Sequence, residues 1–60
     1  LGYYMSPAKV ENLINEFEKR MDREEYPEAK EALNQLIDIL GKEHPEVIAL
    51  ESEYRIEAEE

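Results

Sequence analysis

The sequence contains no cysteine, only two glycines and no long apolar run. Without cysteine the chain can form no disulfide and can offer no thiolate to zinc. Gly2 and Gly41 lie far apart, so there is no glycine-rich loop to hold phosphate groups. No apolar run approaches the roughly 20 residues of a membrane-spanning helix. Residues 1–5 lack the basic start and long apolar stretch of a signal peptide, so we expect a cytoplasmic protein.

Positive charge is also scarce. The chain has seven basic and sixteen acidic residues, and its formal net charge is −9. Proteins that bind nucleic acid need a basic surface, and anionic membranes attract the same kind of charge. We therefore expect neither nucleic acid nor a membrane as a partner. The acidity either keeps the surface solvated or attracts a basic protein.

Groups that could perform catalysis are few. The single histidine, His44, stands beside Pro45 and is expected to cap a helix. General acid–base catalysis needs a second titratable group held close to it. Ser6 and Ser52 have no histidine at the spacing of a nucleophile pair, and no Glu-x-x-His motif of the kind found in dimetal helical bundles occurs. The sequence predicts no enzyme, no cofactor, no metal and no small-molecule substrate.

The length of 60 residues allows one small domain. A chain below about 70–80 residues without disulfides or metal depends on regular helix packing or on oligomerisation. The first residue is Leu1, and we expect the chain to be a processed or excised piece of a larger protein.

Proline and glycine divide the sequence into three helical patterns. Ser6-Pro7 and Tyr26-Pro27 are typical helix starts, Gly41 follows a helix end, and Pro45 opens the last pattern. Gly41 is expected to be left-handed, as glycine often is after a helix. The predicted elements are an apolar arm over residues 1–5 and helices over residues 7–22, 26–40 and 45–59. The predicted fold class is all-α, with three antiparallel helices.

Apolar residues recur at steps of three and four in each helix. The first stripe contains Val10, Leu13, Ile14, Phe17 and Met21; the second Ala29, Leu33, Leu36 and Leu40; the third Val47, Leu50 and Tyr54. Leu33 and Leu36 are predicted to be almost fully buried. The second helix carries further apolar residues at Ala32, Ile37 and Ile39, a width that suggests two neighbouring helices.

The third helix repeats part of the first. Val47, Leu50 and Tyr54 have the spacing of Val10, Leu13 and Phe17, 37 residues further along the chain. Helix-pair repeats have periods of roughly 34 to 47 residues. The spacing therefore favours a repeat architecture.

Two motifs flank the second helix. Tyr26-Pro27-Glu28-Ala29 opens it, and Leu40-Gly41-Lys42-Glu43-His44-Pro45-Glu46-Val47 closes it. These motifs resemble a tetratricopeptide repeat of the kinesin-light-chain type, over about 40 residues. The resemblance implies a tetratricopeptide-like helical hairpin with a third, capping helix, and a role in protein binding. The same ending is similar to helical tails of some ATPase-type proteins.

Several apolar residues are left over after the stripes are assigned. Ile56 lies nearly opposite Val47 on its helix, and Ile37 and Ile39 widen the second helix. Tyr3 and Tyr4 belong to no stripe, so they either fold back over the helices or dock on a partner. We therefore predict partner binding through Tyr3, Tyr4, Ile37, Ile39 and Ile56.

The predicted function is a non-catalytic protein–protein interaction or oligomerisation module. Its partner is a second copy or the rest of a parent protein. The alternative is an acidic regulator or decoy of a basic protein, such as an antitoxin or a nucleic-acid mimic. A second alternative is the helical tail of an ATPase-type protein.

Overall fold

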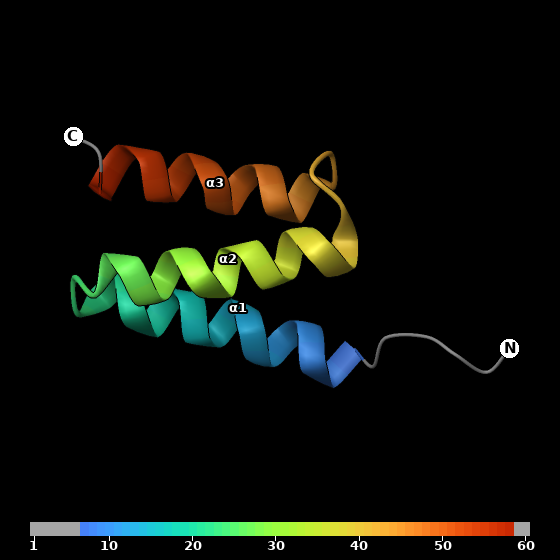
Figure 1. The fold of residues 1–60 in the computed structure, drawn as a ribbon, viewed down its shortest axis with the longest axis horizontal. Coiled ribbons are helices and arrows are strands. Elements are labelled where there is room, and N and C mark those ends of the chain that lie inside the picture. The colour runs from blue at the N-terminus through green and yellow to red at the C-terminus, as the bar shows by residue number, and fades with distance from the viewer. Residues whose placement is uncertain (1–6, 59–60) are drawn as a thin grey trace, which may run out of the picture.

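The computed structural model describes the backbone of residues 7–58 and the side chains of residues 8–58, and within this range the chain is all-α (Figure 1). The helices are α1 (Pro7–Asp22), α2 (Tyr26–Leu40) and α3 (Pro45–Ala58). Successive helices run antiparallel, with their two corners at opposite ends of the molecule (Figure 1). The predicted fold class and helix order are confirmed. The arm over residues 1–5, the Ser6 cap and the predicted last helical residue, Glu59, lie outside the described residues.

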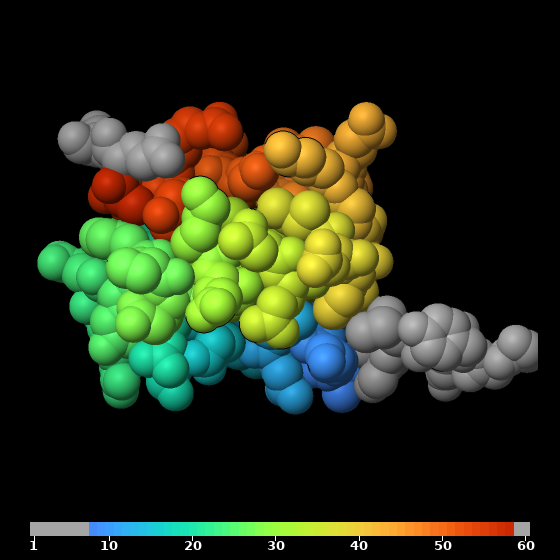
Figure 2. Space-filling model, viewed as in Figure 1, coloured from blue at the N-terminus to red at the C-terminus, as the bar shows by residue number. Residues whose placement is uncertain are grey.

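The middle helix, α2, has neighbours on two sides. It packs extensively against α1 and also against α3. In the space-filling view α2 separates much of α1 from α3 (Figure 2). The wide apolar face predicted for this helix is therefore covered by two helices.

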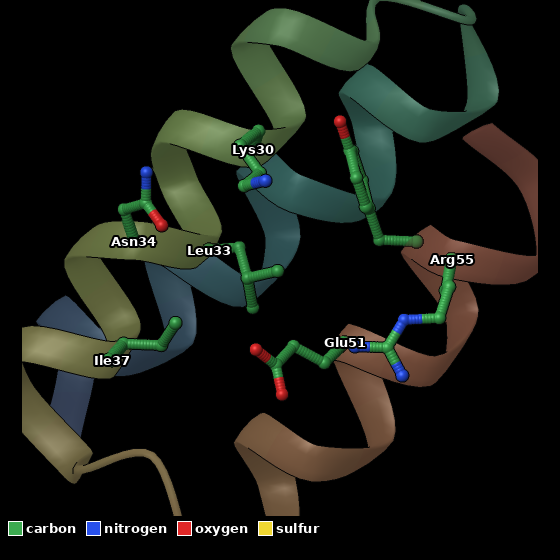
Figure 3. Close-up of a pocket in the computed structure, with 7 residues that line it drawn as sticks. Lys30, Leu33, Asn34, Ile37, Glu51 and Arg55 are labelled. Atoms are coloured by element: carbon green, nitrogen blue, oxygen red, sulfur yellow. The ribbon is translucent and has the colours of Figure 1, made fainter. Parts of the chain in front are cut away.

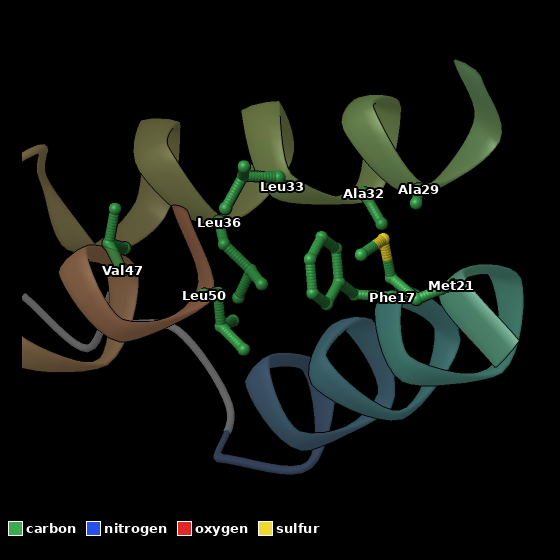
Figure 4. Close-up of a cluster of buried hydrophobic side chains, with 8 residues drawn as sticks. All are labelled: Phe17, Met21, Ala29, Ala32, Leu33, Leu36, Val47 and Leu50. Carbon is green, nitrogen blue, oxygen red and sulfur yellow. The ribbon is translucent and has the colours of Figure 1, made fainter. Parts of the chain in front are cut away.

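The core is a single cluster of buried side chains between the three helices (Figure 4). The cluster consists of Phe17, Met21, Ala29, Ala32, Leu33, Leu36, Val47 and Leu50. Leu33 is 2% exposed and Leu36 is 0% exposed, which confirms their predicted burial. Burying a side chain of this size stabilises a fold by about 1.5–3 kcal/mol, so a few such residues hold most of this small structure together.

Small residues on α2 allow α1 to pack closely. Ala29 and Ala32 are both buried, and they lie beside Met21 of α1 (Figure 4). The bulky members of this contact, Phe17 and Met21, come from α1. Alternating large and small residues across a contact is what lets two helices interdigitate.

The corner between α1 and α2 is a Schellman motif. The Glu25 amide donates to the carbonyl oxygen of Arg20 at 2.8 Å, and the Glu24 amide donates to that of Met21 at 3.0 Å. Glu24 takes the residue position that glycine usually fills, with φ at +60°. A side chain at positive φ is disfavoured, so this corner contains local backbone strain.

Arg20 stabilises the same corner by ion pairs with two carboxylates. Its Nε donates to Glu16 Oε2 and its Nη1 donates to Glu25 Oε1, each at 2.7 Å. The hydrogen bond and the charge of Arg20 lower the pKa of Glu16. Glu25 precedes α2 but makes no side-chain cap on it, because its carboxylate is engaged by Arg20. Pro27 lies in the first turn of α2, where its fixed φ already has a helical value and so favours the start of the helix.

The corner between α2 and α3 turns at Gly41. Its amide donates to the Ile37 carbonyl oxygen at 2.8 Å, and its φ is +96°. The positive φ agrees with the prediction, but the ψ of 152° places Gly41 outside the left-handed helical region. The chain leaves this residue in an extended direction, a combination of angles almost restricted to glycine.

His44 caps the start of α3. Its carbonyl oxygen accepts a hydrogen bond from the Ile48 amide at 2.9 Å, and its Nδ1 accepts one from the Glu46 amide at 3.1 Å. Acceptance by the side chain satisfies one of the amides that have no partner within the helix. The predicted capping role of this histidine is confirmed.

Candidate protein-binding surface

The side of α3 that points away from α2 carries no charge along its length. An α-helix turns by about 100° per residue, which places five exposed residues in one sector, opposite Val47, Leu50 and Tyr54. We call this sector the α3 outward stripe: Pro45, Ile48, Ala49, Ser52 and Ile56. In Figure 1, α3 lies at the edge of the molecule with α2 on one side of it only. The stripe is therefore on the side of α3 that has no neighbour among the described residues.

Two of these residues are large and apolar. The exposed fraction is 51% for Ile48 and 62% for Ile56, and they are the large hydrophobic residues classed as exposed in the described part of the chain. Single exposed apolar residues are ordinary on protein surfaces. Two on one face of a helix, with only the small residues Ala49 and Ser52 between them, make the α3 outward stripe a continuous uncharged surface that is mainly apolar.

Charged residues follow both edges of the α3 outward stripe. Glu46, Glu53 and Glu57 follow the first edge, and Glu51 and Arg55 follow the second. The two edges together therefore carry four carboxylates and one cation. This composition makes the surface around the stripe acidic.

The first edge comes close to α1 at Glu53. Burial and the neighbouring carboxylate of Glu18 raise the pKa of Glu53. Like charges held together in a partly dry place disfavour ionisation. The first edge is therefore a place where an added cation relieves repulsion.

The second edge borders a hollow between α2 and α3 (Figure 3). Its cavity volume is about 60 Å³, and its lining is Lys30, Leu33, Asn34, Ile37, Glu51, Tyr54 and Arg55. The ammonium of Lys30 lies 5.2 Å from the centre of the Tyr54 ring, and Tyr26 meets that ring edge-on at 6.4 Å. Small-molecule sites usually measure about 300–1,000 Å³, so this hollow is too small to hold a typical ligand.

The structure separates the apolar residues that were predicted to bind a partner. Ile37 is half-buried against the core cluster and lines the α2–α3 hollow. Ile39 is half-buried on α2, beside a shallow depression of about 200 Å³ that Lys9, Gln35 and Asp38 also line. Ile56 is exposed on α3. The three isoleucines therefore do not form one surface, and Tyr3 and Tyr4 lie outside the described residues.

Four members of the α3 outward stripe were not predicted from the sequence to bind a partner: Pro45, Ile48, Ala49 and Ser52. Their signal is present, since these positions continue from Pro45 to Ile56 in steps of one, three and four residues. That pattern is obscured because a helix with apolar residues on opposite sides has no single apolar face.

The described residues contain little that could perform chemistry. No group of three histidine, aspartate or glutamate side chains within residues 8–58 is arranged to hold a metal ion. In the same range, every fully buried side-chain nitrogen or oxygen has a hydrogen-bond partner. Helices long and apolar enough to cross a membrane are absent from the described segment.

Comparison with protein-family models, with curated proteins and with solved structures finds no match for this chain. The tetratricopeptide-like character of residues 26–47 therefore stays a prediction from the two motifs.

Proposed function

We propose that this chain is a non-catalytic protein–protein interaction module and that the α3 outward stripe is its docking surface. The single observation that carries the proposal is the exposure of Ile48 and Ile56 on one side of a helix whose opposite side is buried. Contiguous exposed apolar area, bordered by polar residues, marks interaction sites on small proteins. Oligomerisation through the same stripe is one form of this function.

The form of the stripe favours a helix as the docking element. The small residues Ala49 and Ser52 lie between Ile48 and Ile56, so a side chain of a facing helix fits between the two isoleucines. Ridges that enter grooves in this way bring helix axes to about 8–10 Å. A helix docked here would give α3 neighbours on two sides, as α2 already has.

The tetratricopeptide-like reading of the motifs belongs to this proposal, since stacked helix pairs cover each other's exposed faces. A cytoplasmic location is part of it as well. The acidic regulator of a basic protein remains the second candidate, and the carboxylates along the first edge favour it.

Nuclear magnetic resonance of the isotopically labelled chain tests the proposal. The chain is titrated with itself and with a panel of stapled amphipathic peptides of about 18 residues, whose helical form does not depend on binding. An interaction module shows shifts of the amides of Ile48, Ser52 and Ile56 with at least one of these ligands. The variant with Ile48→Asn and Ile56→Asn should lose that response while it keeps its helical circular dichroism.

The matched control changes the corresponding positions of α1. Glu11 and Lys19 stand 37 residues before Ile48 and Ile56 and are exposed. Replacing both with asparagine should leave the response of α3 intact. If no peptide and no second copy shifts the α3 amides at millimolar concentration, the proposal is wrong.

A further inference from the structure

The occupant of the α3 outward stripe can be inferred from the charges beside it; this step rests on the proposed function. We propose that the partner is a basic amphipathic helix, with an apolar stripe that covers Ile48 and Ile56 and with lysine or arginine along both margins.

Charge complementarity carries the inference. Glu46, Glu53 and Glu57 line the first edge and Glu51 shares the second with Arg55, so the surface around the stripe has a net charge of −3. A basic helix that covers the stripe places cations over both edges. Complementary charge at the rim of an interface speeds association and selects the partner.

A cation is further favoured at the first edge because two carboxylates lie close together there. Glu53 of α3 and Glu18 of α1 are near neighbours, and burial together with Glu18 raises the pKa of Glu53. A lysine or arginine brought to this edge offsets the repulsion between the two carboxylates. An apolar or acidic partner leaves that repulsion in place and adds to the desolvation of Glu53.

A second copy of the chain is a poorer occupant. In an antiparallel pair of α3 helices related by a twofold axis, each edge meets its own copy, so Glu46, Glu53 and Glu57 face the same carboxylates. In a parallel pair these three meet an edge that carries Glu51 and one cation, Arg55. Both arrangements bring like charge together, in chains whose net charge is −9 each.

The experiment compares peptides that differ either in the charge of their margins or in the apolarity of their stripe. Three stapled peptides of about 18 residues carry the same leucine stripe, with lysine, glutamine or glutamate along its margins, and a fourth keeps the lysines but has serine in place of leucine. Fluorescence anisotropy gives each Kd at low and high salt, and amide shifts locate the contact. Sedimentation of the chain alone measures self-association.

We expect the lysine-margin peptide to bind about tenfold more tightly than the glutamine-margin peptide at low salt, with the advantage shrinking as salt is added. Ile48→Asn with Ile56→Asn should weaken this binding about tenfold or more. Glu53→Gln with Glu57→Gln should weaken it about two- to fivefold, the worth of exposed ion pairs. The control Glu11→Gln, which removes a single carboxylate on the outward face of α1, should have no effect.

Each other outcome overturns a definite statement. If the glutamine-margin peptide or a second copy binds through α3 as tightly as the lysine-margin peptide, the basic partner is wrong and the interaction module stands. If the serine peptide binds as tightly as its leucine counterpart, the chain acts by charge alone and both proposals are wrong. If no ligand shifts the α3 amides, both proposals are wrong as well.

Discussion

The first and third helices pack on α2 with residues at equivalent positions but face solvent differently. Phe17 of α1 and Val47 and Leu50 of α3 are buried, and Leu13 and Tyr54 pack against the same core. On the outward side, Glu11, Asn12, Asn15 and Lys19 of α1 correspond to Ile48, Ala49, Ser52 and Ile56 of α3, 37 residues later. All eight are exposed.

The outward faces of α1 and α3 differ in a way that the overall composition does not reveal. A helix with one neighbour is expected to have a polar outward face, and α1 meets this expectation. The outward face of α3 is uncharged although charged residues make up 38% of the chain. The contrast within one molecule is the reason to infer a partner for α3 and none for the outward face of α1.

The largest expected effect on stability comes from truncating Leu36, a side chain of α2 that packs between α1 and α3. Leu36 is 0% exposed and lies between Phe17 and Leu50 (Figure 4), so Leu36→Ala should lower the free energy of unfolding by about 2–5 kcal/mol. Urea denaturation followed by circular dichroism measures the loss. The control is Ile48→Ala on the outward side of α3, which should change stability by less than about 0.5 kcal/mol. Equal losses for the two variants would show that Ile48 belongs to the core.

The next largest effect is expected at Gly41, in the corner that joins α3 to the α1–α2 pair. A β-carbon at Gly41 meets no atom within 4 Å, so Gly41→Ala creates backbone strain without a steric clash. At a φ of +96°, that strain should destabilise the fold by about 1–2 kcal/mol. Hydrogen exchange should increase more in α3 than in α1. Lys42→Ala in the same turn is the control, and a loss there as large as at Gly41 would contradict the role of φ.

Much of the fold was predictable because its signals are local. Pro27 and Pro45 start helices, Gly41 ends one, and the periodic leucines identify the buried stripes, so the helix bounds and the burial of Leu33 and Leu36 follow from neighbouring residues. The Schellman corner was not predicted, because Glu24 occupies the position where glycine is the usual signal.

The candidate site was predicted only in part, because it depends on how the helices are placed. Ile56 was identified from its position opposite Val47, which is a local property of one helix. Grouping it with Ile37 and Ile39 required the arrangement of α2 and α3, which periodicity does not give. The approach of Glu18 to Glu53 likewise depends on the rotation of α1 relative to α3.

A smaller effect, which stabilises the fold, is expected from a substitution in the corner between α1 and α2. Glu24→Gly should raise the free energy of unfolding by about 0.5–1 kcal/mol, because glycine accepts the φ of +60° without the penalty of a β-carbon. Glu24→Asn, which tolerates the same region, should gain less. Protection from hydrogen exchange should rise at the end of α1 and leave α3 nearly unchanged. A destabilised glycine variant would show that the Glu24 side chain is needed at this corner.

The smallest effect tests the repulsion between α1 and α3. Because burial and Glu18 raise the pKa of Glu53, the folded chain binds this proton more tightly than the unfolded chain, and stability falls as pH rises through the raised pKa. Glu53→Gln should therefore gain about 0.5 kcal/mol at pH 7. That gain should vanish below the ordinary glutamate value of 4.5. Glu18→Gln should give a smaller gain, because it removes the repulsion but leaves the Glu53 carboxylate partly buried. The double variant should add little to Glu53→Gln, since both variants remove the same repulsion. The control is Glu11→Gln on the outward face of α1; an equal gain there would assign the effect to the net charge of the chain and leave no specific contact between Glu18 and Glu53.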